Sequence, residues 1–422
     1  MKEKINFRKI VIFLLFTFIL FQDSFEITTN LYIITYFDEI FIVVYFIVSI
    51  IKTNGVINKK VLKLFFWILF FLIIGIIGCI YYSNYQLKTL LVSSFLMIKF
   101  FICLMAVMIY PPNEQIKKDI ICSIKILGYI SIFSGLINLI LPKIWLKLIP
   151  YTYTYYRDGL NSIMGLFIHA GQYGWFMMFT ALIYLSEYEV TKSTKKNIGF
   201  FVFAIFALLS LKVKVIITFI FISLLKLFKI EKRKINFKKV IILILVIGVL
   251  ILSNKLIVST YNQYFTDNNK NTSARYALLK GSISIMKDYF PLGVGFSKYG
   301  TFYAAENYSE YYYKYNCDIV WGLMPNAIFF GTDTFWPAIF GETGFLGTVI
   351  YVIILFMIFK WLDINLKLKN NFYSFWGFFV FVQAIIESSG EPIFNSSPQN
   401  ILIAICLGIA LSQKNENDEV KK

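Results

Sequence analysis

Long apolar segments separated by short polar connections recur along the whole chain. About twelve of them approach the roughly 20 residues that a helix needs to cross the hydrocarbon core of a bilayer. The predicted spans are residues 9–22, 31–51, 61–81, 88–110, 120–141, 160–185, 198–211, 213–229, 240–258, 338–360, 372–387 and 400–412. The first span follows basic residues but no small-residue cleavage site, so we expect a retained helix. The pattern predicts an all-α, polytopic integral membrane protein.

One connection, between the ninth and tenth spans, is much longer than the others. It covers residues 254–337, about 84 residues, and is too rich in aromatic residues for a disordered linker. Within it, the pair Thr272-Ser273 can cap a helix whose apolar positions recur at helical spacing until Pro291. We therefore divide the chain into an N-terminal bundle (1–253), a partly helical loop (254–337) and C-terminal helices with a short tail (338–422).

Composition and charge agree with a membrane location. Hydrophobic residues make up 58% of the chain and the mean hydropathy is +0.69, whereas soluble domains are roughly 45–50% apolar. The formal net charge of +17 includes a basic cluster at residues 226–239. The positive-inside rule then places both termini in the cytoplasm and residues 254–337 outside. On this topology the basic cluster lies beside anionic lipid, and we expect no nucleic-acid partner.

Three stretches of the chain, in order, resemble the O-antigen polymerase (Wzy-type) and O-antigen ligase superfamily. They are YYRDGLNSIMGLFIHAGQYG (155–174), ARYALLKGSISIMKDYFPLGVGFSKYG (274–300) and DTFWPAIFGETGFLG (333–347). The segment YFDEI (36–40) is also similar to capsule polymerases. The resemblance covers most of the chain through the order of these stretches and the predicted topology.

The resemblance implies a glycosyltransferase fold of the broad C type that works without a metal ion or other cofactor. It implies transfer of a glycan from an undecaprenyl-pyrophosphate donor to a second lipid-linked glycan, at the outer face of the cytoplasmic membrane. Membrane lipid, a chain-length regulator and a flippase of the same pathway are the further partners that it suggests. Ligases usually carry a His where this sequence has Asp333, which favours a polymerase. An O-antigen ligase and a lipid-linked-oligosaccharide flippase or transporter are the alternatives.

Four cations on the predicted outer side are candidates for binding a pyrophosphate. Arg157 and Arg275 lie in two outer connections, and a planar guanidinium matches phosphate oxygens. Lys212 and Lys214 lie in the tight turn between the seventh and eighth spans. The positive-inside rule disfavours lysines there, so they either reach lipid headgroups or contribute to an anion site.

The same outer side offers three candidates for removing a proton from a sugar hydroxyl. Asp333 precedes the tenth span and Glu342 lies about a turn and a half inside it, so either carboxylate is a candidate base. The alternative for both acids is an ion pair with a nearby cation. His169 is the single histidine and begins the sixth span. It is a candidate for substrate contact, or a hydrogen-bonded packing residue.

Further expectations concern glycines, tyrosines and one intramembrane lysine. Three glycines at three-residue spacing, Gly341, Gly344 and Gly347, predict a smooth stripe that another helix can approach. Tyr299 and Tyr303 belong to a tyrosine-rich segment that suits a sugar face or an aromatic belt at the membrane interface. Lys99 lies near the middle of the fourth span and needs a partner, which Asp38 or Glu39 can supply.

Overall fold

The computed structural model describes residues 7–82, 86–153, 156–157, 160–228, 258, 261 and 273–412. The N-terminal helices are α1 (Phe7–Leu20), α2 (Gln22–Thr29), the 3-10 helix η1 (Tyr32–Tyr36), α3 (Phe37–Lys52), α4 (Lys59–Tyr82), α5 (Leu87–Ile109), α6 (Glu114–Ile140), α7 (Pro142–Leu148), α8 (Ala170–Thr191), α9 (Thr194–Leu208) and α10 (Val213–Phe228). A two-stranded antiparallel hairpin, β1 (Tyr156–Arg157) and β2 (Leu160–Asn161), precedes α8. The later helices are α13 (Ala274–Asp288), α14 (Phe302–Glu306), α15 (Glu310–Lys314), α16 (Trp336–Lys369), α17 (Phe372–Glu387) and α18 (Gln399–Leu411).

The predicted all-α, polytopic membrane fold is confirmed. Every predicted span that falls within the described residues contains a helix, whereas the span at 240–258 lies almost wholly outside them. Among the described helices, 5 are long and apolar enough to cross a bilayer by themselves. The number becomes 6 if α1 and α2, which meet at 74°, form one broken span. The total of about twelve spans stays a prediction.

The sixth predicted span begins later than expected. Residues 160–169 form β2 and turns, and the helix starts only at Ala170. Gly165 adopts a positive φ of 51° in this segment. The segment is apolar because it is buried against neighbouring helices: Ile163 N donates to Leu209 O at 3.1 Å, and Met164 N donates to Asn138 Oδ1 at 3.1 Å. Hydrophobicity alone does not distinguish such a buried turn from a helix.

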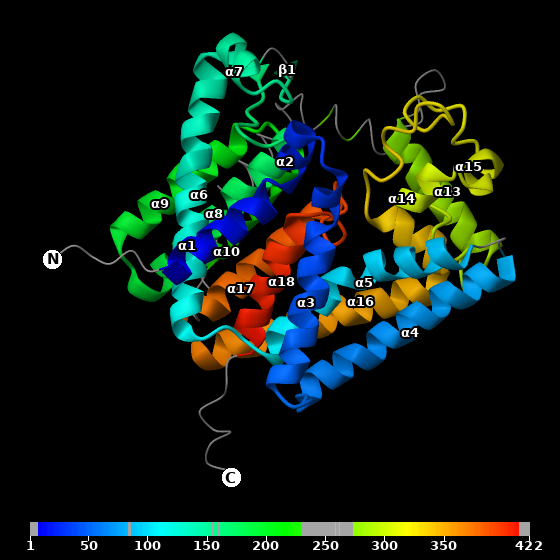
Figure 1. Cartoon of the computed structure of the whole chain (residues 1–422), viewed down its shortest axis with the longest axis horizontal. Helices are drawn as coiled ribbons and strands as arrows, with labels where there is room; N and C mark the ends of the chain where they lie inside the picture. Colours follow the sequence, from blue (N-terminus) through cyan, green and yellow to red (C-terminus); the bar gives the residue numbers. More distant parts are fainter. Residues whose placement is uncertain are drawn as a thin grey trace.

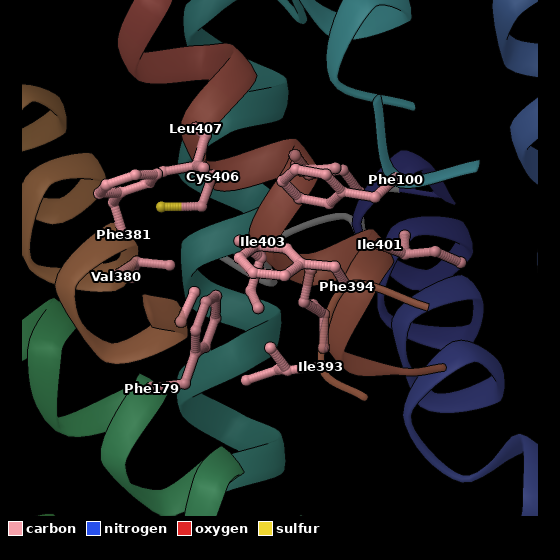
Figure 2. Close-up of a cluster of buried hydrophobic side chains, with 14 of the residues drawn as sticks. Phe100, Phe179, Val380, Phe381, Ile393, Phe394, Ile401, Ile403, Cys406 and Leu407 are labelled. Carbon is pink, nitrogen blue, oxygen red and sulfur yellow. The ribbon is translucent and has the colours of Figure 1, made fainter. Parts of the chain in front are cut away.

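A large hydrophobic core joins α5, α8, α17 and α18 at the centre of the bundle (Figure 1). Its side chains interdigitate from all four helices and from the segment after α17. Those labelled in Figure 2 are Phe100, Phe179, Val380, Phe381, Ile393, Phe394, Ile401, Ile403, Cys406 and Leu407. A second, smaller core holds residues 274–323 together. This part of the long connection is therefore a packed unit rather than a flexible linker.

The long connection docks into α16 at a point where this helix is interrupted. Gly344 has φ 58° and ψ −153°, which breaks the helical path. Two carbonyl groups that are freed by the break accept hydrogen bonds from the connection. Val294 N donates to Gly341 O at 3.0 Å, and Gly295 N donates to Glu342 O at 2.8 Å. Backbone bonds of this kind fix the position of the connection on the bundle.

The glycine stripe on α16 receives this loop, and the predicted neighbouring helix is not its closest partner. A Cβ on Gly344 would collide with the backbone of Gly293, and a Cβ on Gly341 would lie 2.9 Å from the Tyr299 ring. Both Gly293 and Tyr299 belong to the loop after α13. Another chain segment does approach these glycines closely, as predicted, but it is a loop and not a helix. The interrupted helix presents carbonyl groups that the N–H groups of the loop can reach.

The Lys99 cluster lies inside the bundle between α3 and α5. Lys99 Nζ contacts Asp38 Oδ2 at 2.8 Å and Glu39 Oε1 at 2.7 Å. Gln22 Nε2 donates to the other Asp38 oxygen at 3.2 Å, which ties α2 to the pair. The prediction that an acid of the second span neutralises Lys99 is confirmed, with both acids contributing.

Candidate functional site at the junction of the long connection and the bundle

Charged and polar side chains from separate parts of the chain gather where residues 273–335 meet the helical bundle. They come from α2, α13 and α17, from the starts of α8 and α10, and from the segments before α16 and after α17. We call this group the loop-side cluster. Its members are Asp23, His169, Lys212, Lys214, Arg275, Asp333, Glu387 and Glu391.

Arg275 and Asp333 form an ion pair at the surface of this cluster. The Ser273 side chain accepts from Tyr276 N at 3.3 Å and caps α13, so Arg275 lies in the first helical turn. Its Nε and Nη2 lie 2.6 and 2.5 Å from the same Asp333 oxygen, Oδ2. The two side chains are 31% and 30% exposed. Both charged groups can therefore be reached from outside.

Lys214 forms the second centre of charge in the cluster. It pairs with Glu391, and Glu387 Oε2 lies 3.9 Å from its Nζ. Glu387 is fully buried and accepts from Gln383 Nε2 at 2.9 Å. Gly171, in the first turn of α8, leaves the space that this arrangement needs, since a Cβ there would collide with the Glu391 carboxylate.

His169 lies between the two centres and precedes α8. Its Nδ1 is 3.4 Å from the Tyr153 hydroxyl. Although the ring reaches the surface, burial lowers its pKa, and the neighbouring Glu391 carboxylate opposes this shift. The charge of Lys212, in the turn before α10, also lowers the pKa of His169. At neutral pH the imidazole is therefore uncharged and can accept a proton.

Burial raises the pKa of Asp333 above its usual value, and the Arg275 guanidinium opposes this shift. The charges of Glu391 and Lys214 also act on Asp333, which connects the two charge centres electrostatically. A carboxylate with a raised pKa is a stronger base than a solvated one. The Arg275 guanidinium favours the ionised form of this carboxylate.

The other predicted cation and the tyrosines occupy different surroundings. Arg157 lies in β1, but its side chain is outside the described residues. Tyr299 is fully buried, and its hydroxyl donates to Leu278 O at 3.1 Å, so this ring supports the loop fold and is not accessible to a sugar. Tyr303, in α14, stays partly exposed.

Glu342 is placed for a structural role. It is fully buried, and its Oε1 accepts from Lys298 N at 2.8 Å and from Thr301 Oγ1 at 2.6 Å. The same oxygen also accepts from Tyr299 N at 3.1 Å. This carboxylate thus binds the backbone of the loop that docks on α16. The alternative that we gave for it, an ion pair with an outer cation, is not formed by any described residue.

Three acids of the cluster were missed by sequence analysis: Asp23, Glu387 and Glu391. Asp23 accepts from Gln172 Nε2 at 2.9 Å, which brings α2 to the start of α8. The sequence did offer one signal for the other two acids, which is the side of the membrane on which they are predicted to lie. Glu387 ends an apolar segment and Glu391 lies in the polar connection that follows, on the same predicted side as residues 254–337.

Within its described part, the cluster combines cations that can bind a polyanion with acids and an imidazole that can accept a proton. Comparison with known protein families agrees with this chemistry. Residues 198–352, which include Lys214, Arg275 and Asp333, match the family described as O-Antigen ligase. A search of the curated proteins found no match to this chain. The family match, together with the helical membrane fold, supports a relationship of this chain to the O-antigen ligase and polymerase superfamily.

Proposed function

We propose that this protein is a polysaccharide polymerase. In this proposal it transfers a glycan from an undecaprenyl-pyrophosphate donor to a lipid-linked repeat-unit acceptor, without a metal ion, at the outer face of the cytoplasmic membrane. The observation that carries the proposal is the accessible Arg275–Asp333 pair, which lies within electrostatic reach of Lys214 and Glu391.

Orientation follows from the distribution of basic residues. The loop-side cluster lies near the starts of α8, α10 and α16, and the opposite ends of these helices carry Lys192, Lys226 and Lys367. By the positive-inside rule those ends face the cytoplasm. The cluster then faces outward, where lipid-linked repeats are joined in this superfamily according to the resemblance described above.

The first task of the site is to bind the pyrophosphate. Arg275 can exchange the Asp333 carboxylate for phosphate oxygens, because both side chains are partly exposed. A carboxylate and a phosphate each offer two oxygens to a guanidinium. The first turn of α13 adds the positive end of a helix dipole. Lys212 and Lys214 add two cations on the α10 side of the cluster, of which Lys214 is paired with Glu391.

The second task is to remove one proton. The acceptor hydroxyl oxygen attacks the anomeric carbon, its proton passes to Asp333, and the bond between that carbon and the pyrophosphate oxygen breaks. The leaving pyrophosphate keeps the electron pair and stays bound to the cations. When Arg275 moves to the pyrophosphate, Asp333 loses the partner that lowers its pKa, so it becomes more basic as the donor binds. His169 is the second candidate base.

A second candidate function is that of an O-antigen ligase, which is favoured by the description of the matching family. The two functions differ in the acceptor. In cells, loss of a polymerase leaves single lipid-linked repeats, whereas loss of a ligase leaves complete polymer on undecaprenyl pyrophosphate. A flippase would move lipid-linked repeats without joining them.

The test is a reaction of purified protein in detergent with lipid-linked repeat units. Extended, lipid-linked chains are expected without added nucleotide. Asp333→Asn should abolish most of the extension, whereas Glu310→Gln, an exposed acid of the same connection, should not change it. Absence of extended product from folded wild-type protein would overturn the polymerase proposal. Full activity of Asp333→Asn would overturn the role of Asp333 as the base.

A further inference from the structure

A groove opens at the end of the bundle that is opposite the loop-side cluster. It lies between the start of α6, the end of α8 and the start of α17, and it has a volume of about 480 Å³. These helices pack side by side in the bundle (Figure 1). The groove is lined by Lys118, Ile121, Cys122, Lys125, Glu187, Val190, Thr191, Phe372 and Tyr373. None of these residues contributes to the site described above.

The polar end of the groove has an excess of positive charge. Lys125 and Lys196 share one acid, Glu187, at 2.5 and 2.7 Å. Lys117 pairs with Glu114 at 2.7 Å. Lys118 is exposed and forms no ion pair with any described residue. The lining of the groove itself contains two lysines, Lys118 and Lys125, and one acid, Glu187, whose carboxylate is also paired with Lys196. The lining is therefore short of negative charge.

The remainder of the groove is apolar and lies between transmembrane helices. Ile121 and Val190 line it on one side, and Phe372 lines it on another. Cationic and aromatic side chains above an apolar wall match a ligand with an anionic headgroup and hydrocarbon chains. We propose that this groove is a binding site for an anionic phospholipid, with its phosphate at Lys118 and Lys125 and its acyl chains along Ile121, Val190 and Phe372.

The choice of an anionic phospholipid over a neutral one follows from charge. A zwitterionic headgroup would bring a second cation next to Lys118 and Lys125, whereas a net negative headgroup compensates them. The groove is open, and one of its walls, α6, is long and apolar enough to cross a bilayer with less than half of its apolar window buried, so a lipid can enter the groove laterally. This inference does not depend on the proposed glycan transfer.

The proposal is tested by native mass spectrometry of the full chain released from bilayers that contain phosphatidylglycerol and phosphatidylcholine. One phosphatidylglycerol is expected to be retained in preference to phosphatidylcholine. Lys118→Gln should weaken retention about fivefold, since a lysine near an anionic lipid surface contributes about that factor. Lys118→Gln with Lys125→Gln should abolish it. Lys196 remains as a partner for Glu187 in that double variant.

A second variant distinguishes a lipid bound in the groove from nonspecific attraction of anionic lipids to the lysines. Cys122 lines the groove and is the single exposed cysteine, while the other four of this chain are buried. Cys122→Trp leaves the charge unchanged but fills the groove, so it should also remove the retained lipid. Lys360→Gln, an exposed lysine on α16, is the matched control and should retain it.

Bound lipid should also slow the reaction of Cys122 with a maleimide in the wild-type chain, and Lys118→Gln should reverse that protection. Equal retention of both lipids, or retention that is unchanged by Lys118→Gln and Cys122→Trp, would overturn the proposal. If the double lysine variant does not fold, these two single variants decide. Because the readout is lipid retention, a negative result leaves the glycan-transfer proposal standing, and loss of transfer activity does not affect the lipid site.

Discussion

The Lys99 cluster and the Arg275–Asp333 pair contain the same types of charged groups in different surroundings. Lys99 and Asp38 expose 5% and 2% of their side chains, whereas Arg275 and Asp333 expose 31% and 30%. The first cluster is fixed by two acids and by Gln22 inside the bundle. The second pair is partly exposed, and we propose that another anion can separate it. Accessibility, rather than the residue types, therefore distinguishes a structural ion pair from a candidate binding site.

Lys214 is intermediate between these two cases. Its side chain is 9% exposed, with one fully buried acid, Glu387, and one partly exposed acid, Glu391. We infer that Lys214 both stabilises the bundle and presents charge to the loop-side cluster. A substitution of Lys214 should therefore affect stability and activity together. Substitutions in the Lys99 cluster should mainly affect stability, and those in the Arg275–Asp333 pair should mainly affect activity.

The largest effect is expected for Lys99→Met. This change leaves Asp38 and Glu39 buried without their cation, and breaking a buried ion pair in this way costs about 3–5 kcal/mol. Thermal unfolding in detergent should show a large decrease in the melting temperature. The triple variant Lys99→Met, Asp38→Asn, Glu39→Gln should recover much of the loss, because no charge then remains. A wild-type melting temperature for Lys99→Met would contradict the structural role of this cluster.

The next effect tests the support beneath the loop-side cluster. Gly344→Ala places a side chain at φ 58° and against the Gly293 backbone. Residues other than glycine rarely adopt this combination of φ and ψ, which costs roughly 1–3 kcal/mol, and overpacking adds about 1–3 kcal/mol. We expect lower stability and faster proteolysis of residues 273–335, measured by limited digestion. Gly55→Ala is the control, because φ is 73° there and nothing lies within 4 Å. It shows the cost of a side chain at positive φ without a steric clash.

Arg275→Gln should reduce glycan transfer by about tenfold to a hundredfold, since a hydrogen bond to a charged group contributes roughly 1.5–3 kcal/mol. Stability should change by less than about 1 kcal/mol, because the pair is exposed to solvent. Steady-state kinetics with lipid-linked repeats measure the first effect and thermal unfolding measures the second. Lys280→Gln, on the exposed face of α13, is the matched control. Equal losses of stability in Arg275→Gln and Lys99→Met would remove the contrast between the two regions.

The smallest effect concerns pH. If ionised Asp333 is the base, activity falls as pH decreases through its raised pKa. Arg275 lowers that pKa, so Arg275→Gln should move the acidic limb of the rate profile to higher pH. For stability the sign is opposite: a carboxyl whose native pKa is raised makes the fold more stable as pH falls through that value. Asp333→Asn should remove both dependences. An unchanged acidic limb in Arg275→Gln would assign proton removal to another group.

Much of the fold was predictable from local pattern. Apolar length identified the helices, and Ser273 with the following apolar spacing identified α13. The partner of Lys99 was predictable because a charge in hydrocarbon requires compensation. The start of α8 was not predictable. Residues 160–169 are mostly apolar, and an apolar segment is compatible with a buried turn as well as with a helix.

The candidate site was predictable in part. Arg275, Asp333 and Lys214 were identified as outer charges, and the structure brings them to one place. Glu387 and Glu391 were missed, because an acid at the end of a span is also common at a solvated helix end. Glu342 and Tyr299 were candidates by residue type, and burial shows why they serve the loop that docks on α16.

By itself, the sequence determined a helical membrane protein with a long, structured connection, since hydrophobic length, charge placement and caps act locally. The tertiary structure alone decided which charges meet and which of them stay accessible. Ion pairing and burial depend on contacts between residues far apart in the chain, such as Arg275 with Asp333 and Lys214 with Glu391. No local pattern encodes those distances, because they arise only when the helices pack and the loop docks at Gly344.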